Sequence, residues 1–95
     1  MRIAISRSPR KNKKFVADVN GRKVHFGDSN YDDFTTHRNE QRKKNYISRH
    51  RKNENWNDVR TAGFYAKNVL WNRPTISESL KDMNSRFKDV SFVLK

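Results

Sequence analysis

The side chains that can do chemistry in this sequence are mainly cations, and most of them gather in one segment. Residues 37–52 hold seven Lys and Arg side chains and a single acid. Within this segment Arg42, Tyr46 and then Arg49 or His50 recur every three or four residues, which places them on one side of a helix. Nucleic-acid surfaces combine cations for phosphates with rings for stacking. The alternative is that the tyrosine contacts the protein core and the cations are solvated.

A second basic segment lies near the N-terminus, at residues 7–14. It contains five basic residues, one proline and no large apolar side chain, so we expect a loop. Its Ser8-Pro9-Arg10-Lys11 stretch resembles the Ser-Pro-basic-basic motif of histone tails. There, a turn presents two cations to a narrow minor groove, where the negative potential is concentrated. A solvated basic loop or a nuclear-localisation run is the alternative.

The charge balance favours a polyanionic partner. The 95 residues include 22 Lys and Arg against 10 Asp and Glu, a formal net charge of +12. Nucleic acid is the commonest polyanion that such a chain meets, and we expect DNA rather than RNA. The candidate contacts are Arg7, Arg10, Lys11, Lys13, Lys14, Arg38, Arg42, Lys43, Tyr46, Arg49, His50 and Arg51.

The sequence offers a weaker indication of metal chemistry. Asp32, Asp33 and His37, with His25 and His50 elsewhere, are residue types that metal-dependent nucleases use. Their spacing is not diagnostic, and the two aspartates stand where a helix cap is expected. No glycine-rich phosphate loop and no HExxH or GxSxG motif is present. We therefore assign no catalytic residue, no metal, no cofactor and no small-molecule substrate.

Composition also limits the setting in which the protein works. No run approaches the roughly 18 apolar residues of a membrane span, and no secretory signal is recognisable, so we expect no membrane partner. The absence of cysteine excludes disulfides and thiolate zinc sites. These features predict an intracellular or virion-internal protein.

The elements that position the cations are predicted from periodicity. Residues 2–6 alternate as a strand with Ile3 and Ile5 on its buried face. Asn20-Gly21 predicts a type I′ hairpin turn, with Val19 opposite Arg22 and the register continuing outward from that pair. Phe15, Ala17, Val24 and Phe26 then share the core side of the hairpin, whereas Val16, Asp18, Lys23 and His25 share the other side.

Three helices and a closing strand follow. We expect a basic helix at about residues 37–52, a buried helix at 61–71 and an amphipathic helix at 76–88 that begins with a Thr75–Glu78 capping box. Residues 90–94 alternate as a strand that pairs beside the first strand. The predicted fold is one α+β domain over residues 1–95, with a small antiparallel sheet that includes a β-hairpin and both termini, packed by two to three helices.

The order of several motifs resembles a known family. The segments are Val24-His25-Phe26-Gly27-Asp28, Tyr31 to His37, Arg42, Tyr46 to His50, Trp56, Thr61-Ala62-Gly63-Phe64 and Leu70 to Thr75. Over about residues 15–80 they resemble a small, functionally uncharacterised protein family of nucleocytoplasmic large DNA viruses. The resemblance implies a viral setting and transfers no catalytic or ligand residues.

Three functions follow from these observations. The first is a non-catalytic basic viral protein that binds nucleic acid, in the virion or in the nucleus or cytoplasmic virus factory of the infected cell. The second is a minor capsid or virion-assembly protein whose cations meet acidic surfaces of neighbouring capsid subunits. The third is a small metal-dependent nuclease.

Overall fold

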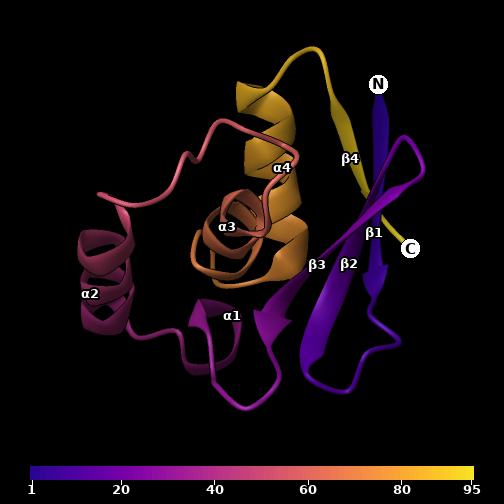
Figure 1. The fold of residues 1–95 in the computed structure, drawn as a ribbon. Helices are drawn as coiled ribbons and strands as arrows, with labels where there is room; N and C mark the ends of the chain where they lie inside the picture. Colours follow the sequence, from indigo (N-terminus) through magenta and orange to yellow (C-terminus); the bar gives the residue numbers. More distant parts are fainter.

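The computed structural model describes residues 1–95 and confirms an α+β fold (Figure 1). The elements follow in the order β1 (Arg2–Arg7), β2 (Lys13–Val19), β3 (Arg22–Asp28), α1 (Phe34–His37), α2 (Glu40–His50), α3 (Ala62–Tyr65), the π-helix η1 (Ala66–Leu70), α4 (Ile76–Arg86) and β4 (Ser91–Leu94). None of these helices combines the length and the apolar composition that a bilayer span requires.

The sheet is mixed and has the strand order β3-β2-β1-β4. Both terminal strands belong to it, as expected, but β4 runs parallel to β1, so the prediction of an antiparallel sheet was wrong for this pair. Alternating apolar residues specify which face a strand buries and leave its direction open. The direction is set by α4, which packs against the sheet and delivers the chain to the start of β4 beside the start of β1 (Figure 1).

The hairpin has the predicted register. Val19 lies opposite Arg22, and the pairing continues to Phe15 opposite Phe26. Asn20 and Gly21 have φ angles of 53° and 87°, the left-handed conformation that a type I′ turn requires. The N-terminal basic segment is shorter than predicted, because its two ends belong to β1 and β2 and only residues 8–12 connect them. Strand pairing includes Arg7, opposite Phe15, and Lys13, opposite Asp28.

All helices lie on one side of the sheet, and the core forms between them (Figure 1). The sheet contributes Ile3, Ile5 and Phe26, each at most 1% exposed, and α3 contributes Phe64 and Tyr65 at 0%. The segment predicted as the most buried helix is therefore central, although its second half is a π-helix. In α4 the predicted apolar stripe packs on the same core, and its N-terminus is the predicted cap, with the Thr75 hydroxyl accepting the N–H of Glu78.

The basic helix predicted at 37–52 is two helices. Asp33 caps a single turn, α1, which ends at Arg38 in the left-handed conformation with φ 53°. Asn39 then caps α2 by accepting the N–H of Arg42. The run of cations gave no sign of this break, because neither residue is a glycine or a proline. The break turns α2 away from the sheet, so that it stands apart from the other helices (Figure 1).

Two substitutions in β4 test how the closing strand packs on the core. Phe92 is 2% exposed and packs among the core rings, so Phe92→Ala should lower the free energy of unfolding by about 3–5 kcal/mol. Leu94→Ala, at a side chain that is 51% exposed, should lower it by no more than about 1 kcal/mol. Urea denaturation of the two variants measures both values, and similar losses would contradict this packing.

Candidate nucleic-acid interface

A ladder of aromatic rings holds α2 against the rest of the protein. The Tyr46 ring stacks on Trp71 at 4.4 Å with 3° between the planes, and on His50 at 4.2 Å. Trp71 in turn contacts His37 at 5.2 Å, and His37 contacts the edge of Phe34 at 6.2 Å. Tyr46 is 8% exposed and stacks on two different rings, so it anchors the helix and leaves no free face for a base. Of the two interpretations of this residue, the geometry favours the core contact.

Two basic side chains reinforce the same attachment. Lys43 donates to the carbonyl oxygen of Asn72 at 2.6 Å, and its Nζ lies 5.0 Å from the centre of the Phe34 ring. Arg38 donates from Nε to the carbonyl of Pro74 at 3.2 Å. Both cations were predicted as partner contacts, and in the structure both bind the loop after η1.

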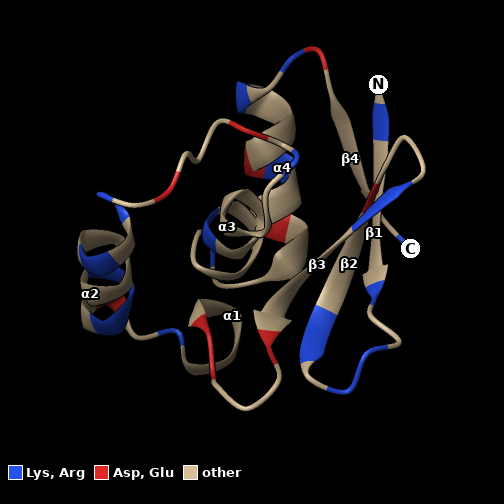
Figure 2. Ribbon diagram, in the orientation of Figure 1, with Lys and Arg blue, Asp and Glu red and all other residues tan.

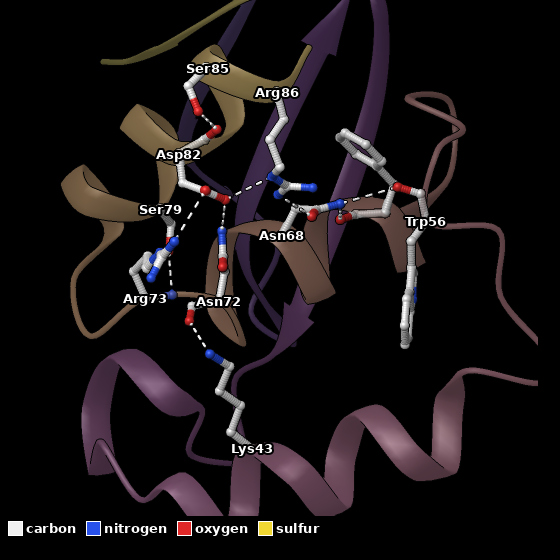
Figure 3. Close-up of polar contacts among 10 residues, drawn as sticks. Lys43, Trp56, Asn68, Asn72, Arg73, Ser79, Asp82, Ser85 and Arg86 are labelled. Atoms are coloured by element: carbon white, nitrogen blue, oxygen red, sulfur yellow. Dashed lines mark hydrogen bonds and ion pairs between the residues drawn. The ribbon is translucent and has the colours of Figure 1, made fainter.

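A polar network fixes the segment that carries Trp71 (Figure 3). The Asp82 carboxylate accepts from the Asn72 amide at 2.7 Å, from Arg86 at 2.9 Å and from Arg73 at 3.3 Å. Arg86 also donates to the buried Asn68 amide at 2.8 Å. These bonds join α4, η1 and the loop at residues 72–75, and Lys43 extends the connection to α2 (Figure 3). These hydrogen bonds therefore fix the segment that carries Trp71, the ring on which Tyr46 stacks.

The end of η1 has the wide hydrogen bonding of a π-helix. The N–H of Trp71 donates to the carbonyl of Ala66, five residues earlier, at 3.1 Å. The Asn68 side chain, which is fully buried, donates to the carbonyl of Phe64 at 3.0 Å. Single-turn π segments inside helices occur frequently at functional sites. Here the segment presents Ala66, Leu70 and Trp71 to a cleft.

The cleft lies between α2 and the body of the protein and has a volume of about 620 Å³. Its floor is mainly apolar and is formed by η1 with Tyr46. One wall is the face of α2 that carries Arg42 and Arg49. The other wall is the end of β3 and the following loop, with Asp28, Tyr31 and Asp32. The predicted helical face of Arg42, Tyr46, Arg49 and His50 thus comes together on one cavity.

Gly27 permits the close approach that forms this floor. Its φ of 82° is in the left-handed region. A Cβ at this position would lie 2.7 Å from Cδ1 of Leu70. A side chain here would therefore strain the backbone and displace the Leu70 side chain that forms part of the floor.

The cations around α2 have no acidic partners in the protein. Figure 2 shows that this helix and its flanks are predominantly basic. Of the six ion pairs in the structure, the five that involve Lys or Arg use Lys14, Lys23, Arg60, Arg73 and Arg86. The sixth joins His50 to Glu54 at 3.1 Å. The unpaired Lys and Arg side chains of residues 38–52 are Arg38, Arg42, Lys43, Lys44, Arg49, Arg51 and Lys52.

The exposed tip of the N-terminal basic segment is separate from α2, although Lys14 at the end of the segment lines the cleft. Figure 2 shows the two on opposite sides of α1, with acidic residues between them. The Ser8 hydroxyl accepts the N–H of Arg10 at 3.1 Å, which forms the turn that the Ser-Pro motif predicts, and it also contacts Nδ1 of His25 at 2.8 Å. Arg10 and Lys11 remain exposed at its tip. The arm and the basic helix therefore do not form one continuous surface.

Lys14 has a structural role that the sequence did not reveal. Its Nζ lies 2.6 Å from Oδ2 of Asp33, and the two side chains are 20% and 4% exposed. The same carboxylate accepts the N–H of Thr35 at 2.9 Å and the hydroxyl of Thr35, and so caps α1. Asp33 is thus the predicted helix cap, and it forms an ion pair with Lys14. The contact of Lys14 with a partner stays a prediction.

The residues considered for a metal site are dispersed. No three His, Asp or Glu side chains lie where they could hold a metal ion together. His37 instead accepts the N–H of Asn39 at Nδ1, at 2.9 Å, and its buried Nε2 has no partner. Burial and, next, the nearby Arg42 lower the pKa of His37, and burial and Arg10 lower that of His25. His37 therefore belongs to the aromatic ladder as a neutral ring.

Asp28, Tyr31 and Trp71 are among the cleft residues that sequence reasoning did not predict as contacts. Trp71 was predicted as part of the buried helix, and Asp28 and Tyr31 were named only among the motifs of the family resemblance. Nothing local signals their role, because it depends on the distance between β3 and α2.

One comparison with known proteins gave a match. Residues 3–50 match the family of unknown function DUF5754, a range that runs from β1 to the last residue of α2. No curated protein and no solved structure matches the chain.

The ladder predicts a local response to loss of the tyrosine ring. Tyr46→Ala removes the ring that joins Trp71 to His50, so α2 should detach while the sheet stays folded. Hydrogen exchange should then rise in residues 40–50 and remain slow in β1 and β2. Tyr46→Phe keeps the ring and serves as the control. Uniform loss of protection across the chain would contradict a local anchor.

The neutral state of His37 predicts that stability falls in acid. Because its pKa is lowered in the folded protein, the unfolded chain takes up the proton first. Stability is therefore complete above the unfolded pKa of about 6.5 and falls as the pH drops below it. Urea midpoints at about pH 7.5 and about pH 5.5 measure this loss. His37→Gln should reduce the loss, and His25→Gln shows the share of the other histidine; an unchanged loss in His37→Gln would contradict the assignment.

Proposed function

This chain belongs to the DUF5754 family of unknown function, and we propose that it is a non-catalytic DNA-binding protein that uses the exposed cations of α2 and its C-terminal flank. The observation that carries the proposal is the unpaired set of Lys and Arg side chains on a helix held in place by stacked rings. The exposed members are Arg42, Lys44, Arg49, Arg51 and Lys52.

The charges of α2 support an external polyanion because they contribute little to folding. Only one side chain of the helix, Tyr46, is buried. A helix gains most of its stability from an apolar face, and clustered like charges repel one another. Phosphates would relieve that repulsion and release counterions from the DNA, which favours binding without sequence preference.

The proposed setting is the virion or the infected cell of a large DNA virus. It rests only on the resemblance in motif order described above. The competing function is a capsid or assembly protein, in which acidic side chains of a neighbouring subunit would meet the same cations.

Salt dependence tests the proposal. A duplex that covers one side of α2 meets about three of its cations, which predicts a slope of about −2.7 for log K against log[salt]. Arg49→Ala should lower the magnitude of this slope by about 0.9 and weaken all duplexes alike. Fluorescence anisotropy with labelled duplexes of different sequence measures both effects.

The matched control is Arg22→Ala, an exposed and unpaired arginine at the hairpin, which should leave the slope unchanged. Equal effects of the two variants would indicate a diffuse attraction rather than a surface on α2. If no duplex or single strand binds at about 50 mM salt, the DNA proposal fails, because binding driven by charge is strongest at low salt. The capsid function would then be the better explanation of the same cations.

A further inference from the structure

We propose that the cleft between α2 and β3 binds one unpaired nucleotide of a DNA strand, with its base stacked on Tyr31 and its base edge bonded to Asp28 or Asp32. The inference rests on the proposed DNA-binding function and adds that the same surface recognises an unpaired nucleotide. A cavity of about 620 Å³ lies within the range of about 300–1,000 Å³ that small-ligand pockets occupy.

Tyr31 is the free aromatic ring of the cleft. Its side chain lines the cavity and is 71% exposed, compared with 52% for Met1 and 51% for Leu94. No other ring and no cation packs against it, in contrast to Tyr46 and Trp71 on the floor. An exposed ring beside phosphate-binding cations provides the stacking surface that proteins use for single strands.

Two carboxylates beside this ring would repel a ligand that consists of phosphate alone. Asp28 and Asp32 are exposed and form no ion pair, although the chain carries 22 Lys and Arg. Oδ1 of Asp28 accepts the N–H of Asn30 at 2.9 Å, so Oδ2 is the oxygen of this carboxylate that is left for a ligand. Asp33, the third acid of the cleft, is already neutralised by Lys14. Free carboxylates repel phosphates, but they accept hydrogen bonds from the amino groups of bases. The cleft therefore suits a ligand with an anionic end and a hydrogen-bond-donating end.

The opposite wall supplies the cations for the anionic end. Arg42 and Arg49 both line the cleft and are seven residues apart, which is about 10 Å along the helix axis. The phosphates on either side of the bound nucleotide can lie along this wall while the base enters the cleft. A paired base cannot enter, because its edge is occupied and its faces are stacked.

A stacking role for Tyr31 is tested with single strands and duplexes. Tyr31→Ala should weaken binding of oligo(dC) by roughly 5- to 150-fold, which corresponds to about 1–3 kcal/mol, and leave duplex affinity unchanged. Tyr31→Phe retains a ring and should retain the affinity. The ring is exposed and unpacked, so none of these changes should affect thermal stability. Unchanged oligo(dC) binding by Tyr31→Ala would overturn the proposal.

The carboxylates give a second test, because a hydrogen-bonding role and a purely repulsive role predict different changes in affinity for the two oligonucleotides. Cytosine has an amino donor, whereas thymine offers only N3–H between two carbonyl oxygens that repel a carboxylate. Asp28→Asn or Asp32→Asn, whichever removes the bonded carboxylate, should therefore reduce the preference for oligo(dC) over oligo(dT) by about 5- to 150-fold. Asp89→Asn removes the same charge from the loop before β4 and should leave the ratio unchanged. If the acids only repel DNA, both variants raise both affinities in parallel, and the proposal is overturned.

These outcomes separate the two proposals. The DNA function is supported and the nucleotide site is overturned if duplex binding depends on salt while Tyr31→Ala has no effect and the aspartate variants leave the ratio of oligo(dC) to oligo(dT) affinity unchanged. Failure of the wild-type protein to bind duplex and single strand alike overturns both.

Discussion

The stacking of Tyr46 on Trp71 is the contact on which the position of the basic helix depends. α2 has a single buried side chain, and the tyrosine ring lies parallel to the indole at 4.4 Å. Stacked rings bury a large area and add about 0.5–1.5 kcal/mol beyond that area. Because the attachment is narrow, the rest of the helix remains available to solvent. The same contact that holds α2 therefore leaves its cations unpaired and opens a cleft beside it.

The charges of the protein are divided by role. Asp33, Asp82 and Glu54 accept hydrogen bonds within the fold, and each meets a basic side chain. The unpaired Lys and Arg side chains are densest around α2 and at the tip of the N-terminal arm, which the fold keeps apart (Figure 2). Each of the two basic surfaces can contact a polyanion. Exposed ion pairs between these cations and acidic side chains of the protein would have added little stability.

The floor of the cleft depends on irregular backbone. η1 is a π-helix, and Gly27 has a left-handed conformation opposite Leu70. Asn68 is buried at the centre of the π segment and bonds both to the backbone and to Arg86. A regular α-helix would turn Trp71 to another direction and separate it from Tyr46. The polar network around Asp82 thus stabilises the geometry from which the aromatic ladder extends.

Local patterns in the sequence determined the hairpin, the faces of its strands, the helix caps at Asp33 and Thr75 and the net charge. These follow from interactions between residues close in the chain, as at Asn20-Gly21 and in the Thr75–Glu78 cap. The spacing of Arg42, Tyr46 and Arg49 also indicated one helical face. Only the tertiary structure decided the parallel pairing of β4 and the cleft itself. A segment's pattern shows which face is buried but not which distant residue covers it. The stacking of Trp71 on Tyr46 and the ion pair of Asp33 with Lys14 could therefore not be predicted from spacing.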